Sequence, residues 1–308
     1  MDNPKSTINN RKVKNMKRTF KSLLAAAALA FAGISALINP SSALATTPDI
    51  RNSVQCNRYD GGSFPANSRY YDCTYGAPYT SYNGTAQTTI LNILNSAGYP
   101  QVAPVLQQGT GTKFWIFNNA VDAKAWFTYP TVWGTLAQKQ AEWTAQKGNT
   151  AGSFDPTSTE SCDVRIFVGV GSGLSYPTVT IQTNSQYKNT VAHEIGHCFN
   201  ALWNAPTSYT RLSDSSMFVS LYAKDLAYMQ ANDPNYATNI STFGYWLNDR
   251  DELFAEEFAR TEVGAILPVD NNIAAYWGCT LKYTQTWMKS KRNPTASEFT
   301  AAGLSRCN

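Results

Sequence analysis

The only two histidines of the 308-residue chain lie four residues apart, in the segment VAHEIGHCFN at positions 191–200. Residues four apart on an α-helix lie on the same face, so the imidazoles of His193 and His197 can converge on one ion. Glu194 points about 100° away, where it can accept a proton from a water molecule instead of binding the ion. The spacing therefore predicts a catalytic metal site with Glu194 as general base; the alternative is a structural helix without a metal.

The composition of this site points to zinc. Two imidazoles, a carboxylate and an open position are typical of catalytic Zn²⁺, which usually has three protein ligands. Because no third histidine exists, the third ligand must be a carboxylate downstream. The acidic residues available there are Asp214, Asp225, Asp233, Asp249, Asp251, Glu252, Glu256, Glu257, Glu262, Asp270 and Glu298.

The densest acidic cluster is NDRDELFAEEFAR at positions 248–260. Glu252 and Glu256 lie four apart on one helical face, beside apolar residues that would bury this helix. Burying two carboxylates is costly unless a positive charge offsets them, and a zinc ion would do so. The residues alone leave open which of the two glutamates binds the ion.

The segment ELFAEEF (252–258), downstream of the His-Glu-x-x-His helix, resembles the Glu-Phe-Phe-Ala-Glu-Ala-Phe segment of the anthrax lethal factor-like zinc peptidases. These are gluzincins, a group that includes the Pro-Pro endopeptidases. The resemblance covers about residues 163–265. It implies that Glu252 binds the zinc and that Glu256 supports the site from outside. It also implies that Tyr245, seven residues before Glu252, assists the oxyanion; the alternative is a core aromatic residue beside Trp246.

The first 45 residues predict a signal peptide. Seven Lys and Arg residues lead into the uncharged run LLAAAALAFAGISALI (23–38), and Ala43-Leu44-Ala45 has the small-x-small form of a cleavage site. The alternative is a membrane anchor, for which the run is somewhat short. We therefore expect a secreted or periplasmic protein that has no membrane association after cleavage.

The charge of the remaining chain gives no reason to expect nucleic acid as a partner. Of the 25 basic and 21 acidic residues, seven and one respectively lie in residues 1–45, which leaves 18 basic against 20 acidic. The basic character of the full sequence belongs to its leader. We expect a monomer that acts on a polypeptide substrate.

Six cysteines in an exported chain favour three disulfides. Pairing of nearest neighbours predicts Cys56–Cys73, Cys162–Cys198 and Cys279–Cys307. The second pair would attach the histidine helix to a buried strand. A free buried thiol is the alternative for Cys198.

The order of the predicted elements, with strands mostly before helices, indicates an α+β fold. We expect a loop-rich segment over 46–85 and a zincin-like metallopeptidase domain over 86–308, with a small mixed sheet and a helical C-terminal half stabilised by disulfides. Predicted strands are 113–119, 163–171 and 178–184, the last as the edge that binds substrate. Predicted helices are 85–99, 136–146, 185–203 with Ser185 as N-cap, 214–230, 250–261 and 271–291.

Two other functions share this metal site. One is a zinc hydrolase that cuts an ester or a cell-wall amide instead of a peptide. The other is a zinc-binding adhesin or pseudoenzyme without turnover, against which the intact Glu194 argues. A Ser-His-Asp triad is excluded because both histidines are committed to the metal motif. The leading hypothesis is a secreted zinc-dependent endopeptidase.

Overall fold

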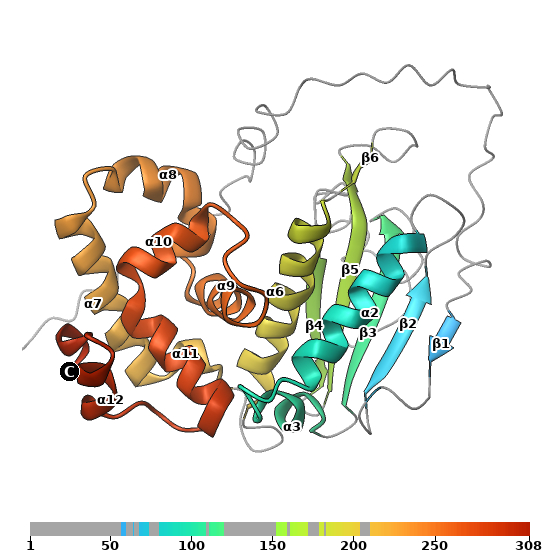
Figure 1. The fold of residues 1–308 in the computed structure, drawn as a ribbon, viewed down its shortest axis with the longest axis horizontal. Helices are drawn as coiled ribbons and strands as arrows, with labels where there is room; N and C mark the ends of the chain where they lie inside the picture. The colour runs from blue at the N-terminus through green and yellow to red at the C-terminus, as the bar shows by residue number, and fades with distance from the viewer. Residues whose placement is uncertain are drawn as a thin grey trace, which may run out of the picture. The chain divides into compact units, whose positions relative to one another are not determined.

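A computed structural model describes residues 57–59, 64, 68–73, 80–108, 111–119, 152–158, 161–171, 179–181, 183–203 and 210–308. All of them belong to one compact unit, Ala45–Asn308. The predicted leader over residues 1–45, the helix over 136–146 and Cys56 lie outside the described residues. The fold has the expected α+β character, with a sheet followed by a helical C-terminal half (Figure 1).

The sheet has three parallel strands at its centre. These are β2 (Arg69–Cys73), β3 (Gly111–Asn119) and β5 (Ser161–Gly171). The strands β1 (Asn57–Tyr59), β4 (Gly152–Ser158) and β6 (Val179–Ile181) pair antiparallel at its borders. The order is β1-β2-β3-β5-β4, and β6 pairs with β5 beyond the end of β4.

The strand expected at 178–184 corresponds to β6, which is only three residues long. Because β3 pairs with one edge of β5 as far as Gly169, β4 and β6 must lie in succession along its other edge. Among the described strands, β4 ends the sheet on that side. It was not predicted, because the Gly, Asp and Pro residues of GSFDPTS are depleted in strands.

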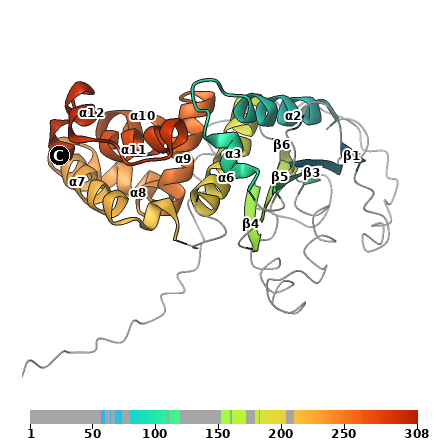
Figure 2. The ribbon, with the colours of Figure 1, turned by 90° about the horizontal axis from the view of Figure 1, so that it is seen from below.

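Helices α2 (Thr80–Leu94), α3 (Val102–Leu106) and α6 (Asn184–Leu202) lie on one side of the sheet (Figure 2). The apolar side chains Ile90, Phe114 and Ile166 of this layer are fully buried in one core. Helix α2 begins five residues before the expected start at residue 85, so the boundary drawn between 85 and 86 falls inside it. Strands β1 and β2 likewise join the same sheet as β3.

Helix α6 carries the histidine motif, and its N-cap is Thr183 instead of Ser185. The Thr183 hydroxyl accepts a hydrogen bond from the backbone of Gln186 (3.3 Å), and the Gln186 side chain accepts one from the backbone of Thr183 (3.1 Å). This reciprocal capping box satisfies two backbone donors at once, whereas Ser185 lies inside the helix. From Val191 to Asn200 every residue is buried.

The C-terminal half is helical, as predicted, with three differences, one of which is the short helix Ala296–Ala301 that was not predicted. The helix expected over 271–291 is divided into two helices at Trp277, and the region before Asn248 forms a helix that was not predicted. The described helices here are α7 (Ser216–Asn232), α8 (Tyr236–Leu247), α9 (Arg250–Val263), α10 (Val269–Tyr276), α11 (Gly278–Ser290) and α12 (Ala296–Ala301). Short 3-10 turns are η3 (Leu212–Asp214) and η4 (Ser305–Cys307).

Two of the expected disulfides are confirmed. Cys162–Cys198 joins β5 to α6, with the Cα atoms 5.9 Å apart, and Cys279–Cys307 joins α11 to the chain end. The first bond follows directly after His197, so it attaches the histidine motif to the centre of the sheet. The pairing expected for Cys56 lies outside the described residues.

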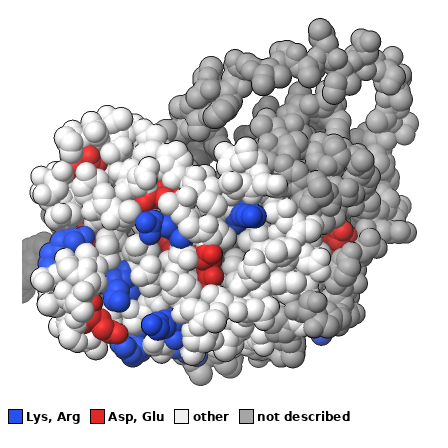
Figure 3. Space-filling view, in the orientation of Figure 1, with Lys and Arg blue, Asp and Glu red and all other residues white. Residues whose placement is uncertain are grey.

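On the face seen in Figure 3, Lys and Arg residues are interspersed with Asp and Glu over the described part of the chain. No helix among the described residues has the length and apolar character required to cross a bilayer.

Candidate metal centre

Helices α6 and α9 lie side by side and pack closely (Figure 1). A Cβ built on Gly196 would lie 2.9 Å from the Cα of Ala255 and from the Cβ of Phe258. Glycine therefore allows the closest approach of the two helices at this crossing, one residue before His197. The closeness allows side chains of α9 to reach the histidines of α6.

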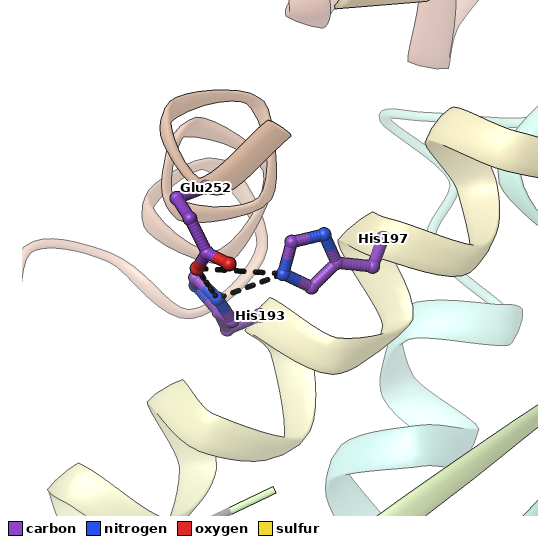
Figure 4. Close-up of side chains that lie close together, drawn as sticks. All are labelled: His193, His197 and Glu252. Carbon is purple, nitrogen blue, oxygen red and sulfur yellow. Dashed lines mark hydrogen bonds and ion pairs between the residues drawn. The ribbon is translucent and has the colours of Figure 1, made fainter. Parts of the chain in front are cut away.

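The side chains of His193, His197 and Glu252 converge between the two helices (Figure 4). Glu252 Oε2 lies 3.1 Å from His193 Nε2 and 3.6 Å from His197 Nε2. The two Nε2 atoms are 3.2 Å apart. Glu252 is thus the carboxylate that faces both imidazoles, and this His-His-Glu group could hold a metal ion.

The three distances suit one small cation. Ligand atoms at about 2.0–2.1 Å from a tetrahedral zinc ion lie about 3.3–3.4 Å from one another, close to the measured 3.1, 3.2 and 3.6 Å. Two Nε2 atoms at this separation can share at most one proton, so at least one lone pair points into the space between the rings. The donor set and its spacing both fit a divalent cation.

Glu256 lies behind His193 and not between the rings. Its Oε2 is 2.9 Å from His193 Nδ1, and its Oε1 accepts a hydrogen bond of 3.1 Å from the amide of Asn189. A proton on Nδ1 donated to this carboxylate leaves the Nε2 lone pair directed at the metal position. Glu256 is fully buried, so it can orient His193 from outside the ligand set.

The acids and imidazoles shift one another's pKa values in opposite directions. Burial would lower the pKa of His193, but its hydrogen bonds to Glu252 and Glu256 outweigh this and raise it well above the usual value. Burial lowers the pKa of His197, with a further contribution from the charge of His193. Burial would raise the pKa of Glu252, yet its hydrogen bonds to the two imidazoles lower it. The site thus favours an ionised Glu252 beside positive charge.

Glu194 lies on the buried side of the same helix turn and is 7% exposed. Burial raises its pKa to about 8, with the charge of Glu252 also raising it and the charges of His193 and Arg165 lowering it. A cation between the histidines would lower this pKa further by direct attraction. Glu194 therefore has the surroundings of a carboxyl that can both take and release a proton near neutral pH.

Tyr245 lies in the last turn of α8 and reaches the same site. Desolvation, the charges of Glu252 and Glu194 and a hydrogen bond to Glu252 all raise the pKa of its phenol. The residue as a whole is 48% exposed, and its ring also contacts Trp246 edge to face. Tyr245 is not a core residue, and the raised pKa keeps its hydroxyl a neutral donor beside Glu252.

No family model, curated protein or solved structure matches this chain.

Two further residues belong to this centre and were missed in the sequence. Asn189 and Asn200 are buried, and they lie four residues before His193 and three after His197. Their spacing places both asparagines on the helical face of the histidines, but this spacing alone does not indicate a functional role. An asparagine there carries no metal chemistry of its own, and only its partners on α9 reveal the connection.

Proposed function

We propose that the protein is a secreted zinc-dependent endopeptidase of the lethal factor-like type. The observation that carries this proposal is the convergence of His193, His197 and Glu252, with Glu194 beside them on the histidine helix. Three protein ligands with a neighbouring free carboxyl are the composition of a hydrolytic zinc site. A site that only stored zinc would need no such base.

His193, His197 and Glu252 would hold the zinc ion, with Glu256 and Asn189 fixing the orientation of the first imidazole. When bound, zinc would polarise the scissile carbonyl and lower the pKa of a water molecule. Glu194 accepts the proton of the attacking water on its carboxylate and passes it to the departing amine. Burial raises the pKa of Glu194, which makes its carboxylate a stronger base.

Tyr245 is placed to stabilise the oxyanion. Its phenol is a neutral donor that reaches the carboxylate of Glu252, and the oxyanion would form beside that ligand. A donor in such a position can contribute about 3 kcal/mol to the transition state. Rotation of the phenol from Glu252 to the substrate would supply this hydrogen bond.

The edge of the sheet near α6 offers a peptide-binding strand. Strand β4 ends the described sheet and packs against α6. An extended peptide can add to such an edge through backbone hydrogen bonds, which bind many sequences with the same register. This supports a polypeptide substrate over an ester or a cell-wall amide.

The test is cleavage of a broad peptide library by the purified protein supplied with zinc, read by mass spectrometry. Glu194→Gln removes the base at constant size and should lower turnover by about 10²–10⁴-fold. Absence of cleavage by the wild-type protein, or equal cleavage by the variant, refutes the peptidase. Products from peptidoglycan alone would identify an amidase, and tight zinc binding without any turnover a binding protein.

Glu252→Gln has a matched control on the same helix. Glu257 is fully buried and points to α11, where Thr284 Oγ1 donates to its Oε2 at 2.7 Å, whereas the Glu252 side chain is 18% exposed. We expect Glu252→Gln to lose zinc far more readily than Glu257→Gln on dialysis against a chelator. Equal metal content in the two variants would rule out Glu252 as the third ligand.

A further inference from the structure

A second set of polar side chains connects α6 and α9 beside the candidate metal centre. Asp251 Oδ1 accepts hydrogen bonds from the amide of Asn200 (3.2 Å) and from the hydroxyl of Ser213. The backbone of Ser213 donates to Asn200 Oδ1 at 2.9 Å. Arg211 forms an ion pair with the other oxygen of Asp251. We call these four residues the Asn200–Asp251 bridge.

The place of the bridge in the two helices ties it to the ligands. Asn200 lies three residues after His197, which puts it on the same face of α6 about one turn further along. Asp251 is the residue before Glu252, in the first turn of α9. The bridge therefore joins α6 to α9 at positions next to those of His197 and Glu252.

The centre of the bridge, formed by Asn200 and Ser213, is buried. Asn200 is 1% exposed and Ser213 is fully buried. The hydrogen bonds of the bridge involve both the NH2 group and the oxygen of the Asn200 amide. They also involve the hydroxyl and the backbone N–H of Ser213. An amide whose two ends are both committed holds its partners in one arrangement, because any displacement leaves a buried polar group unpaired.

Besides the apolar packing of Leu253 and Phe254, which are fully buried, the other described polar contacts at the start of α9 are exposed. Its N-cap is Asp249, which accepts from the backbone of Asp251 (2.9 Å). An ion pair between Arg250 and Asp214 joins the same turn to η3 (3.0 Å), but both side chains are at least 40% exposed. An exposed pair of this kind constrains geometry weakly.

We propose that the Asn200–Asp251 bridge positions the metal site: it fixes the first turn of α9 against α6 and so sets the distance of Glu252 from the two imidazoles. Asn200, Ser213, Asp251 and Arg211 are positioning residues, since none touches the metal position. The inference rests on the proposed function only in taking the His-His-Glu group as a metal site. It adds that residues outside the motif determine how tightly the metal is held.

The test is a titration of the metal-free full chain with Co²⁺, followed through its visible absorption bands, and a competition of Zn²⁺ with a chromophoric chelator. Asp251→Ala removes the acceptor from one helix and Asn200→Ala the donor from the other. Each should weaken metal binding by about tenfold or more, in the range found for groups that support metal ligands. Asp251→Asn keeps the acceptor oxygen for Asn200 and Ser213 but loses the ion pair with Arg211, so its metal affinity should lie between those of Asp251→Ala and the wild type.

Arg250→Gln is the matched control, because it breaks the exposed ion pair that joins the same turn of α9 to η3 and should leave metal affinity unchanged. The Co²⁺ spectrum at saturation separates positioning from general stability, since only a displaced ligand changes it. Wild-type affinity and spectrum in both alanine variants would overturn the proposal, as would equal losses in Arg250→Gln. If one alanine variant does not fold, the other decides. A wild-type protein that binds neither metal would refute the metal site itself, and the proposed function with it.

Discussion

Replacement of Gly196 by alanine tests whether the metal site depends on the close packing of α6 and α9. The added methyl carbon would lie 2.9 Å from the Cα of Ala255 and 3.0 Å from its carbonyl oxygen. Ordinary contacts begin near 3.4 Å, so the helices must separate by roughly half an ångström. Two of the three contacts are backbone atoms, which cannot rotate away.

The expected effect on stability is small. Overpacking of a core costs about 1–3 kcal/mol, while alanine gains about 1 kcal/mol over glycine in a helix. The difference is a loss of about 0–2 kcal/mol. Metal binding should respond more strongly, because Ala255 lies between Glu252 and Glu256, and ligand distances are tolerated only within about 0.2 Å. We expect zinc affinity to fall by about 10–100-fold, as for other disturbed metal sites.

The assay compares urea unfolding of the metal-free protein with zinc affinity from chelator competition. Gly84→Ala is the control, because Gly84 lies in helix α2 with nothing within 4 Å of an added Cβ. It should stabilise the protein by up to about 1 kcal/mol and leave zinc affinity unchanged. Wild-type zinc affinity in Gly196→Ala would refute the reasoning that the crossing distance sets the ligand geometry.

Three further predictions concern other parts of the molecule. Tyr245→Phe should keep its zinc and lose about 100-fold in peptide turnover; unchanged kinetics would remove Tyr245 from the mechanism. Asp225→Asn, which breaks the ion pair with Arg306 (2.9 Å), should lower the free energy of unfolding by about 3 kcal/mol in urea titrations, and a loss below 1 kcal/mol would contradict this. Burial raises the pKa of Asp270 to about 6, so the folded state binds more protons than the unfolded state and stability falls as pH rises from about 4 to 6. Asp270→Asn should flatten this dependence between pH 4 and 7, and an unchanged slope would assign it to other groups.

The sequence predicted those residues of the site that lie close together along the chain. His193, Glu194 and His197 lie within five residues on one helix, so the helical period alone predicts which of them share a face. The partner Glu252 lies 55 residues after His197, and periodicity cannot show that α9 packs against α6. The close approach at Gly196 is equally invisible, since a glycine inside a helix has many causes.

The elements show the same limit. The strand expected over 163–171 was correct, because its Val, Ile and Phe residues and the glycines at its end favour a short buried strand over a helix. Helix α8 was not predicted, since YATNISTFGYWL contains β-branched residues and a glycine that disfavour helix formation. Leu247 is its only fully buried residue, and the apolar face formed by Tyr236, Ile240, Phe243 and Trp246 is only partly buried. Yet α8 carries Tyr245 to the site, which shows that tertiary contacts and not local propensity hold this helix in place.

The packing of α6 against α9 explains why two histidines are enough for the candidate metal site. Along α6, Asn189, His193, His197 and Asn200 occupy one face, and each contacts an acidic side chain of α9. The two asparagine contacts at the ends are ordinary hydrogen bonds between an amide and a carboxylate. The contacts in the middle differ, because two imidazole nitrogens face each other at 3.2 Å with a carboxylate oxygen beside them. Such a triangle gains most from one cation, since a proton can satisfy only part of it. A third histidine is unnecessary because α9 supplies the carboxylate oxygen. The asparagine contacts on both sides of the histidines hold α9 in position against α6.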